Sequence, residues 1–265
     1  MFEGNKRKEG YTEESKLLIA KLKDKINLSK KTNKILYTDF LDISEMSEAK
    51  KFLKEEKISS YIIYGVREDA DRNIIIFYSE KFSKEMVEKN LKNILQIIRI
   101  DFPANTSFEH REILSGIMKL GLVREKFGDI VIKDSFAQII VLKEVADYLI
   151  NNLKMLTRFR RCTLELKEIS DFENKENEFE ELKIIISSNR LDSFVSELAK
   201  TSRSVANEYI EQGKVFINGV NEYKTSKKII ENDIITIRGK GKFIFIGIEK
   251  ETKSGRLLAN IKKYK

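Results

Sequence analysis

Basic side chains near the end of the sequence have the spacing expected of a surface that binds an anion. Arg190, Lys200, Arg203 and Lys214 fall outside two helical stripes of apolar residues, so they can share an exposed face. Ser202 is a favourable N-cap for the second predicted helix, whose free backbone N–H groups can hold a phosphate. Arg203 would lie in the first turn of that helix, where a cation opposes the helix dipole unless an anion binds beside it.

Further cations follow shortly afterwards in the sequence. The segment RGKGKF places glycines between three of them, so the backbone there can approach a phosphate closely. An ordinary basic turn between two strands is the alternative, and binding is favoured because the turn belongs to the same basic region. The additional candidate residues are Lys227, Lys228, Arg238, Lys240 and Lys242.

Positive charge is concentrated in the last third of the chain. Residues 184–265 hold 16 Lys and Arg against 9 Asp and Glu, whereas residues 1–183 hold 34 against 33. A general abundance of lysine would instead raise the charge along the whole chain. A localised excess of cations is typical of a domain that binds a polyanion.

The composition argues against several other kinds of site. One Cys and one His cannot form a disulfide or a Cys/His zinc site, and no motif indicates another metal or a cofactor. No apolar run is long enough to span a membrane, and the N-terminal residues lack the apolar core of a secretory signal. We therefore expect a cytoplasmic protein, monomeric, with no metal, cofactor or membrane contact.

His110 is the only histidine, and it invites a catalytic interpretation. A general base needs an aligned partner and a substrate pocket, and the sequence shows neither. A local hydrogen bond at the start of a helix is the favoured interpretation, and contact with RNA is the second. We predict no catalytic residue.

The residues before the basic region predict helices and strands in alternation. Apolar periodicity predicts helices over 12–28, 45–56, 84–95, 109–120 and 143–155. Short β-branched and aromatic runs predict hairpins at 61–66 with 73–79 and at 128–134 with 136–142, and further strands at 94–102 and 162–169. The predicted fold class is α+β, with an N-terminal α/β unit over 1–81 and a central α/β unit over 82–170.

An acidic stretch separates these units from the basic region. Residues 171–183 hold six acids and two lysines without periodic apolar residues, which indicates a solvated linker. Residues 184–265 predict a small C-terminal α+β domain, with two helices packed on a sheet. The helical stripes are Leu191, Phe194, Val195 and Leu198, then Val205, Ala206, Tyr209 and Ile210, and Asn218-Gly219 predicts a tight turn between strands.

The basic region resembles the S-four domain, a module named after ribosomal protein four of the small subunit. The matching pattern is RLD at 190–192, SR-x-x-A at 202–206, G-K-V-x-x-N-G at 213–219 and D-x-I at 233–235. The resemblance implies that structured RNA binds to the face of the two helices and the neighbouring basic turn. The first contacts that it implies are Arg190, Ser202, Arg203, Lys214 and Asn218, with Asp192 in a structural role.

The segment HREILSGIMKLGLVREKFGDI at 110–130 resembles the HRD-x-LG…LG…RE…GDI signature of the YlmH family. That family has an N-terminal α/β domain, a central domain expected to bind RNA and a C-terminal S-four domain, so the resemblance extends over most of the chain. Glu112 and Ser115 replace the Asp and Gly that are usual at their positions. The resemblance implies association with ribosomal RNA or tRNA on the large ribosomal subunit, in translation quality control.

A second RNA surface is predicted around this signature. Its candidate residues are His110, Arg111, Arg124 and Lys126. For Arg124 and Lys126, a solvated turn after Gly121 is an equally good interpretation.

Two other classes of function stay open. An RNA-modifying enzyme, such as a pseudouridine synthase or a methyltransferase, could use the S-four domain as an accessory. The RLD here opens the two-helix pattern, however, and no Gly-rich loop follows a predicted strand. A protein-interaction scaffold is the other alternative, which the acidic linker and the nearly neutral N-terminal region permit. We expect an RNA-binding protein that is not an enzyme.

Overall fold

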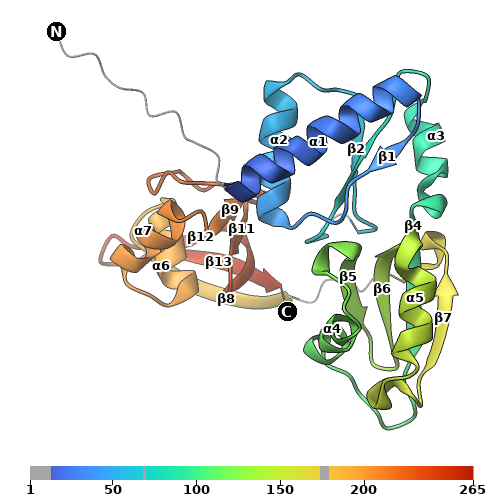
Figure 1. Cartoon of the computed structure of the whole chain (residues 1–265). Coiled ribbons are helices and arrows are strands. Elements are labelled where there is room, and N and C mark those ends of the chain that lie inside the picture. The colour runs from blue at the N-terminus through green and yellow to red at the C-terminus, as the bar shows by residue number, and fades with distance from the viewer. Residues whose placement is uncertain (1–12, 68–69, 174–178, 265) are drawn as a thin grey trace. The chain divides into compact units, whose positions relative to one another are not determined.

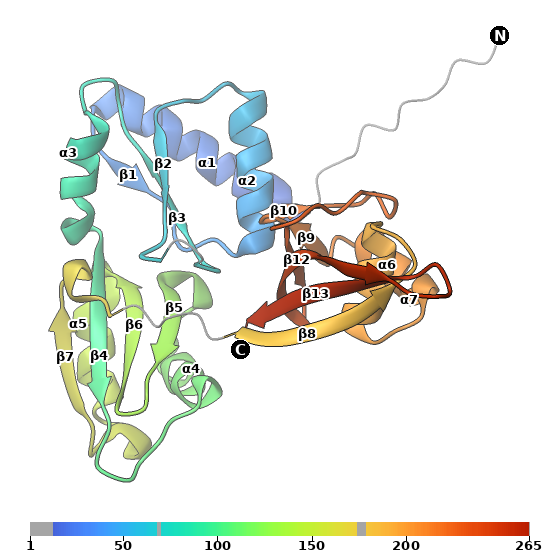
Figure 2. The same cartoon turned by 180° about the vertical axis from the view of Figure 1, so that it is seen from behind.

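The computed structural model describes residues 13–67, 70–173 and 179–264, and the chain divides into two compact units, residues 1–175 and 176–265. Figures 1 and 2 show the elements of both units from opposite sides. Each unit combines helices with antiparallel strands, which confirms the predicted α+β class.

The first half of unit 1 is a three-stranded sheet with two helices on one face. Its elements are α1 (Glu13–Thr32), β1 (Leu36–Tyr37), α2 (Ile43–Glu55), β2 (Tyr61–Tyr64) and β3 (Ile74–Phe77), with strand order β1-β3-β2. Asp42 and Glu45 form a capping box that starts α2, because each carboxylate accepts the other residue's backbone N–H. The two helices bury their apolar stripes against Ile75 and Phe77.

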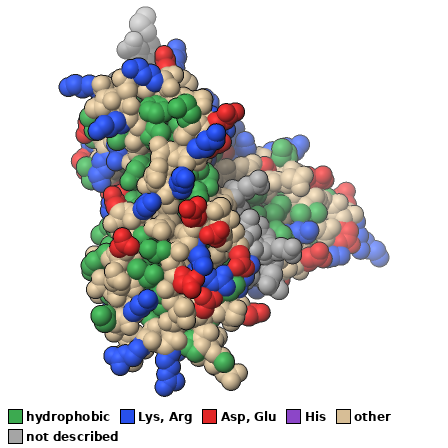
Figure 3. Space-filling view, turned by 90° about the vertical axis from the view of Figure 1, so that its right-hand side faces the viewer, with side chains coloured by type: hydrophobic (Ala, Val, Ile, Leu, Met, Phe, Trp, Pro, Cys, Tyr) green, Lys and Arg blue, Asp and Glu red, His purple; other side chains and the backbone are tan. Residues whose placement is uncertain are grey.

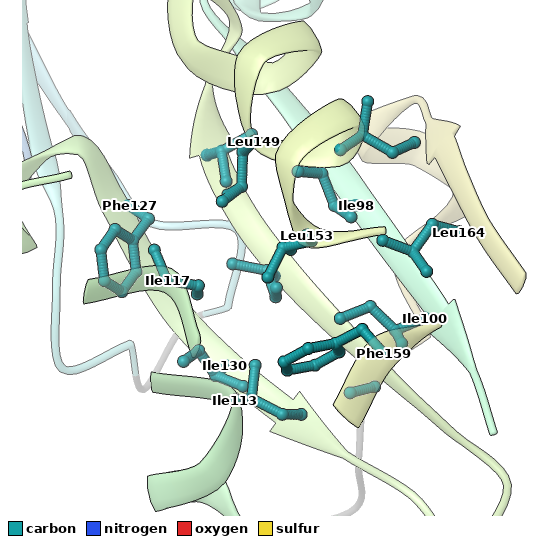
Figure 4. Packing of buried hydrophobic residues seen from close by; sticks show 14 of the residues in the cluster. Ile98, Ile100, Ile113, Ile117, Phe127, Ile130, Leu149, Leu153, Phe159 and Leu164 are labelled. Atoms are coloured by element: carbon teal, nitrogen blue, oxygen red, sulfur yellow. The ribbon is translucent and has the colours of Figure 1, made fainter. Parts of the chain in front are cut away.

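The second half of unit 1 is a four-stranded sheet with strand order β5-β6-β4-β7. Helices α4 and α5 cover one face of it, and Figure 4 shows their core around Ile98, Ile117, Phe127 and Leu149. The elements are α3 (Lys84–Lys89), β4 (Leu95–Asp101), α4 (His110–Lys119), β5 (Phe127–Ile132), β6 (Phe136–Leu142), α5 (Lys143–Leu153) and β7 (Thr163–Lys167), with short 3-10 helices at Leu91–Asn93, Arg124–Lys126, Thr157–Phe159 and Ile169–Asp171.

The two halves of unit 1 share a hydrophobic core. Phe40, Ile74 and Ile76 of the first half pack in one cluster with Ile140 and Leu142 of the second half. Each of these side chains is almost completely buried. The predicted boundary between residues 81 and 82 therefore falls inside one compact unit.

Unit 2 is a six-stranded sheet, with order β10-β9-β11-β12-β13-β8, and two short helices pack on one of its faces. The elements are β8 (Phe179–Ile186), α6 (Leu191–Ala199), α7 (Arg203–Glu211), β9 (Val215–Ile217), β10 (Val220–Asn221), β11 (Ile234–Ile237), β12 (Gly241–Glu251) and β13 (Leu257–Tyr264). The predicted helices over these apolar stripes are confirmed. Ala206 and Ile210 of α7 are fully buried, whereas Val205 is only half-buried.

The predicted linker at 171–183 is partly wrong. Residues 174–178 lie outside the described residues, but 179–183 are the first part of β8, which pairs along its whole length with β13. The strand carries three charged residues among its first five, and two of them form ion pairs with other strands of the sheet: Glu180 pairs with Lys263, and Lys183 pairs with Glu249. Glu180 and Glu181 therefore lie on an edge strand of the sheet rather than in a linker.

Candidate nucleic-acid interface

Two arginines predicted to bind RNA converge on one buried carboxylate in unit 2. The Arg190 guanidinium donates to both Asp192 oxygens, with Nε–Oδ1 at 3.1 Å and Nη2–Oδ2 at 2.8 Å. Arg203 donates to the same two oxygens, both at 3.3 Å. We call Arg190, Asp192 and Arg203 the arginine clamp. It joins the residue before α6 to the first residue of α7.

Burial of Asp192 makes the clamp an outward-facing cationic group. Its side chain is 4% exposed, whereas those of Arg190 and Arg203 are 44% and 51% exposed. Burial alone would raise the pKa of Asp192, but the hydrogen bonds from Arg190 and Arg203 outweigh burial and lower the pKa below its ordinary value. Asp192 therefore stays ionised at neutral pH. One acid holds two arginines in fixed positions and leaves an excess of one positive charge.

Lys227 and Lys228 lie beside the clamp because their backbone pairs with the start of α6. The Leu191 N–H donates to the Lys227 carbonyl oxygen at 2.8 Å, and Arg190 forms an isolated β-bridge with Lys228. Both lysine side chains are exposed. Sequence reasoning placed these lysines in the basic region, and the structure brings them next to Arg190.

The first turn of α7 has the form expected of an anion-binding helix terminus. The Ser202 hydroxyl accepts the N–H of Val205 at 3.3 Å, which confirms that Ser202 is the N-cap. Lys200 precedes it as the C-cap of α6, with a positive φ of 52° and an exposed side chain. The start of α7 therefore has an exposed lysine two residues before its N-cap and Arg203 of the clamp as its first residue. Its first backbone N–H groups are suited to an anion.

A second group of the predicted cations lies near the start of β9 and in the turn between β11 and β12. The Arg238 N–H donates to the Lys214 carbonyl oxygen at 2.9 Å, which makes these two residues neighbours. The Lys214 ammonium is 5.3 Å from the centre of the Tyr209 ring. Lys240 is exposed in the turn between β11 and β12, where Gly239 and Gly241 both have positive φ. Lys242 lies 4.9 Å from the Tyr264 ring.

The S-four resemblance implies that Asn218 contacts RNA, but the structure also gives its side chain a role within the fold. Its side-chain amide donates to Asp233 at 2.8 Å, and its side-chain oxygen accepts the N–H of Ile234 at 2.8 Å. Asn218 and Gly219 both have positive φ, as a two-residue hairpin turn between β9 and β10 requires. Both ends of the Asn218 amide are thus engaged within unit 2.

Arg124 and Lys126, predicted for a second RNA surface, are engaged inside unit 1. The Arg124 guanidinium donates to the carbonyl oxygens of Phe127 and Gly128 at 2.6 and 3.0 Å. Burial, aided by the nearby charge of Arg72, lowers its pKa to about 10. Lys126 bridges Asp39 and Glu144, at 2.9 and 2.8 Å.

These bonds belong to a joint between the two halves of unit 1. Asp129 accepts the backbone N–H groups of Asp71 and Arg72 at 3.1 and 3.2 Å. Gly128 lies so close to Phe40 that an added Cβ would be 2.7 Å from the ring. The GDI part of the signature therefore fastens β5 to the loop before β3.

His110 and Arg111 are the first two residues of α4, but of the two only Arg111 is charged at neutral pH. Partial desolvation and the charge of Arg124 lower the pKa of His110, so the imidazole is neutral at neutral pH. Arg111 is exposed and pairs with Glu109 at 2.8 Å. Glu112, which replaces the usual Asp, accepts the N–H of Glu109 and thereby caps α4. A longer acid is therefore compatible with this helix start.

Sequence reasoning missed three further arginines, Arg158, Arg160 and Arg161. They lie in the turn after α5, and all three are exposed. The segment RFRR, three arginines around one phenylalanine, was a signal that could have found them.

Other kinds of site find no support in the described part of the chain. No group of three His, Cys, Asp or Glu residues there could hold a metal ion. Within the same residues, no helix has the length and apolar character that crossing a membrane requires.

Comparisons with known proteins agree with the signature at 110–130. Residues 88–172 match the family model described as "Putative RNA-binding domain in YlmH". Over these residues the chain is similar to proteins of the YlmH family.

Two particular proteins illustrate the similarity. The chain is 28% identical over 220 residues, 83% of each chain, to the "Ribosome-associated protein quality control protein P2" of Bacillus subtilis (strain 168). It is also similar to the solved structure "Cell division protein ylmH from Streptococcus pneumoniae", with a TM-score of 0.47 and 16% identity. That match covers 62% of this chain and 96% of the other.

Proposed function

We propose that this protein binds structured RNA, ribosomal RNA or tRNA on the large ribosomal subunit, through an S-four-like surface on unit 2. On this proposal it is a cytoplasmic monomer that acts in ribosome quality control as a binding protein without catalysis. The Bacillus subtilis relative is named for ribosome-associated quality control. The family model named for RNA binding matches residues 88–172 of unit 1, so it supports RNA binding by the chain but does not locate it on unit 2.

The arginine clamp is the observation that carries this proposal. Two guanidinium groups fixed on one buried acid present planar donors to solvent, and such donors match the oxygens of a phosphate. The clamp also lies at the start of α7, where backbone N–H groups favour an anion. Lys227 and Lys228 extend the positive surface beyond one phosphate. A row of phosphates on a folded RNA is the ligand that uses all three features together.

The test is RNA binding by the full chain with Arg190→Ala and Arg203→Ala combined. The probe is deproteinised ribosomal RNA, and affinity is measured by filter binding from about 50 to 200 mM salt, where phosphate contacts weaken steeply. We expect the dependence of log affinity on log salt concentration to become shallower by about 1.4 to 1.8, because two phosphate contacts are lost. Lys30→Gln with Lys31→Gln, on the exposed end of α1, removes the same charge elsewhere and serves as the control.

The outcomes separate the proposal from its alternatives. Equal affinity of the clamp variant and the wild type would exclude the clamp as an RNA contact. Equal losses in the clamp variant and the control would show that only total charge matters. Methyl transfer or uridine isomerisation on the same RNA by the wild type would instead indicate an enzyme.

A further inference from the structure

A second cationic group lies on unit 1, on the turn after α5 and the first turn of α4. The turn is anchored by Phe159, whose ring is buried and stacks on Phe108 with centroids 5.3 Å apart. Gly116 permits this contact, because a Cβ there would be 2.5 Å from the Phe159 ring. Figure 4 shows Phe159 lying among Ile100 and Ile113. The residues on either side of Phe159 are exposed, so their side chains face solvent.

Arg158 is held in place by three neighbours. Its guanidinium donates to the Ser107 carbonyl oxygen at 2.9 Å and pairs with Glu112 at 3.0 Å. It also lies 4.4 Å from the centre of the Phe108 ring. These contacts tie the turn after α5 to the residues before α4, so the two segments form one surface. Arg158 is still about half exposed, at 49%.

The charges on this surface do not cancel. Segments 107–112 and 154–162 carry five cations and only two acids, Glu109 and Glu112. The two acids pair with Arg111 and Arg158. Lys154, Arg160 and Arg161 are exposed and have no ion pair within the ranges that the structure describes. We call Arg111, Lys154, Arg158, Arg160 and Arg161 the α4–α5 basic patch. Figure 3 shows Lys and Arg side chains projecting at the lower end of unit 1, where these segments lie in Figure 1.

We propose that the α4–α5 basic patch is a second RNA-binding surface, which takes the phosphate backbone. This inference rests on the proposed RNA-binding function. The family model over residues 88–172 is described as RNA-binding, and the inference assigns the surface within those residues that would contact the RNA. Arginines with free guanidinium groups fit phosphate oxygens in pairs. A protein partner would favour an apolar, charge-depleted centre, and Met155 is the one large apolar side chain strongly exposed on these two segments. Contacts to the sugar–phosphate backbone do not depend on the base sequence, so a surface that offers mainly positive charge is sufficient for them.

The patch replaces the second surface predicted from sequence. Arg111 belongs to both, whereas Arg124 and Lys126 bind carbonyl oxygens and carboxylates of unit 1. Those two cations would have to give up these bonds to reach a phosphate. Arg160 and Arg161 need give up none that the structure describes.

The experiment measures RNA binding by the full chain with Arg160→Gln and Arg161→Gln combined. Both side chains are exposed, so the fold should persist, as circular dichroism would check. Filter binding to deproteinised ribosomal RNA should weaken by about tenfold to sixtyfold near 0.1 M salt, and the salt slope should fall by about 1.4 to 1.8. Lys30→Gln with Lys31→Gln is again the charge-matched control and should bind as the wild type does.

Comparison with the arginine clamp distinguishes the two proposals. If the clamp variant loses affinity while Arg160→Gln with Arg161→Gln binds normally, this inference fails and the proposed function stands. If the patch variant alone loses affinity, RNA binding belongs to unit 1 and the clamp proposal fails. A loss of affinity in the patch variant that is no larger than the loss in the control would refute the proposal that the α4–α5 basic patch binds RNA. Losses in both variants that add in the combined protein support two surfaces on one RNA.

Discussion

Replacing Asp192 with Asn separates two explanations of how the arginine clamp attracts RNA. If only total charge matters, the variant should bind more tightly, because it gains one positive charge. If the fixed geometry matters, the variant should bind more weakly, because Arg190 and Arg203 lose the acid to which each donates two hydrogen bonds. The two explanations therefore predict opposite signs.

The structure sets the size of the expected change. Ordering a long side chain on binding costs about 0.5 to 1.5 kcal/mol, so two freed arginines add roughly 1 to 3 kcal/mol. The positive charge gained by removing the acid improves binding by less than about 1 kcal/mol, because the two arginine groups that would carry it are about half exposed and screened by water. We expect affinity for ribosomal RNA to fall by about threefold to thirtyfold. Because both arginines are half exposed and can turn to water, the fold should lose less stability than the roughly 3 to 5 kcal/mol that breaking a fully buried pair costs.

Filter binding at fixed salt gives the affinity, and circular dichroism confirms that unit 2 stays folded. Asp24→Asn, at an exposed position of α1, changes the net charge equally and controls for total charge. Tighter binding by a folded Asp192→Asn protein would refute the argument from geometry. The clamp would then act as two independent charges.

Two further predictions concern stability. Burial and the charge of Asp71 raise the pKa of Asp129 to about 6, so the folded state holds this proton more strongly than the unfolded state does. Unit 1 should therefore lose stability as pH rises from about 4 through 6, by at most about 3 kcal/mol, and urea titrations should show a flatter pH dependence for Asp129→Asn; an identical dependence in both proteins would contradict this. Ala206→Asp places an unpaired charge in the core of unit 2 and should abolish its thermal unfolding transition while that of unit 1 remains; two intact transitions would show that α7 is misplaced.

The helices of unit 2 could be predicted because their signals are local. Apolar residues recur at helical spacing in α6 and α7, and Ser202 marks the start of α7 by its own hydrogen bond. The spacing overestimated the burial of Val205, which lies at the margin of the stripe. A periodic pattern gives the direction of a face but not its width.

Strand β8 could not be predicted because its partners are distant in the sequence. In the sequence, Glu180 and Lys183 look like part of a solvated tract, and only the fold brings Lys263 of β13 and Glu249 of β12 to them as ion-pair partners. The internal hydrogen bonds of Asn218 and Arg124 could not be predicted for a related reason, since their partners are fixed only by folding. A polar residue type indicates what it can bind, and the fold decides whether it is already occupied.

The core that the two halves of unit 1 share limits how the chain can be divided. The family match begins at residue 88, but Ile140 and Leu142 inside it are covered by Phe40, Ile74 and Ile76 outside it. A fragment that began at residue 88 would expose an apolar face of its sheet to water and would tend to aggregate. Exchange of the central region between relatives, in the laboratory or in evolution, must therefore carry the preceding eighty or so residues with it or replace their apolar cover.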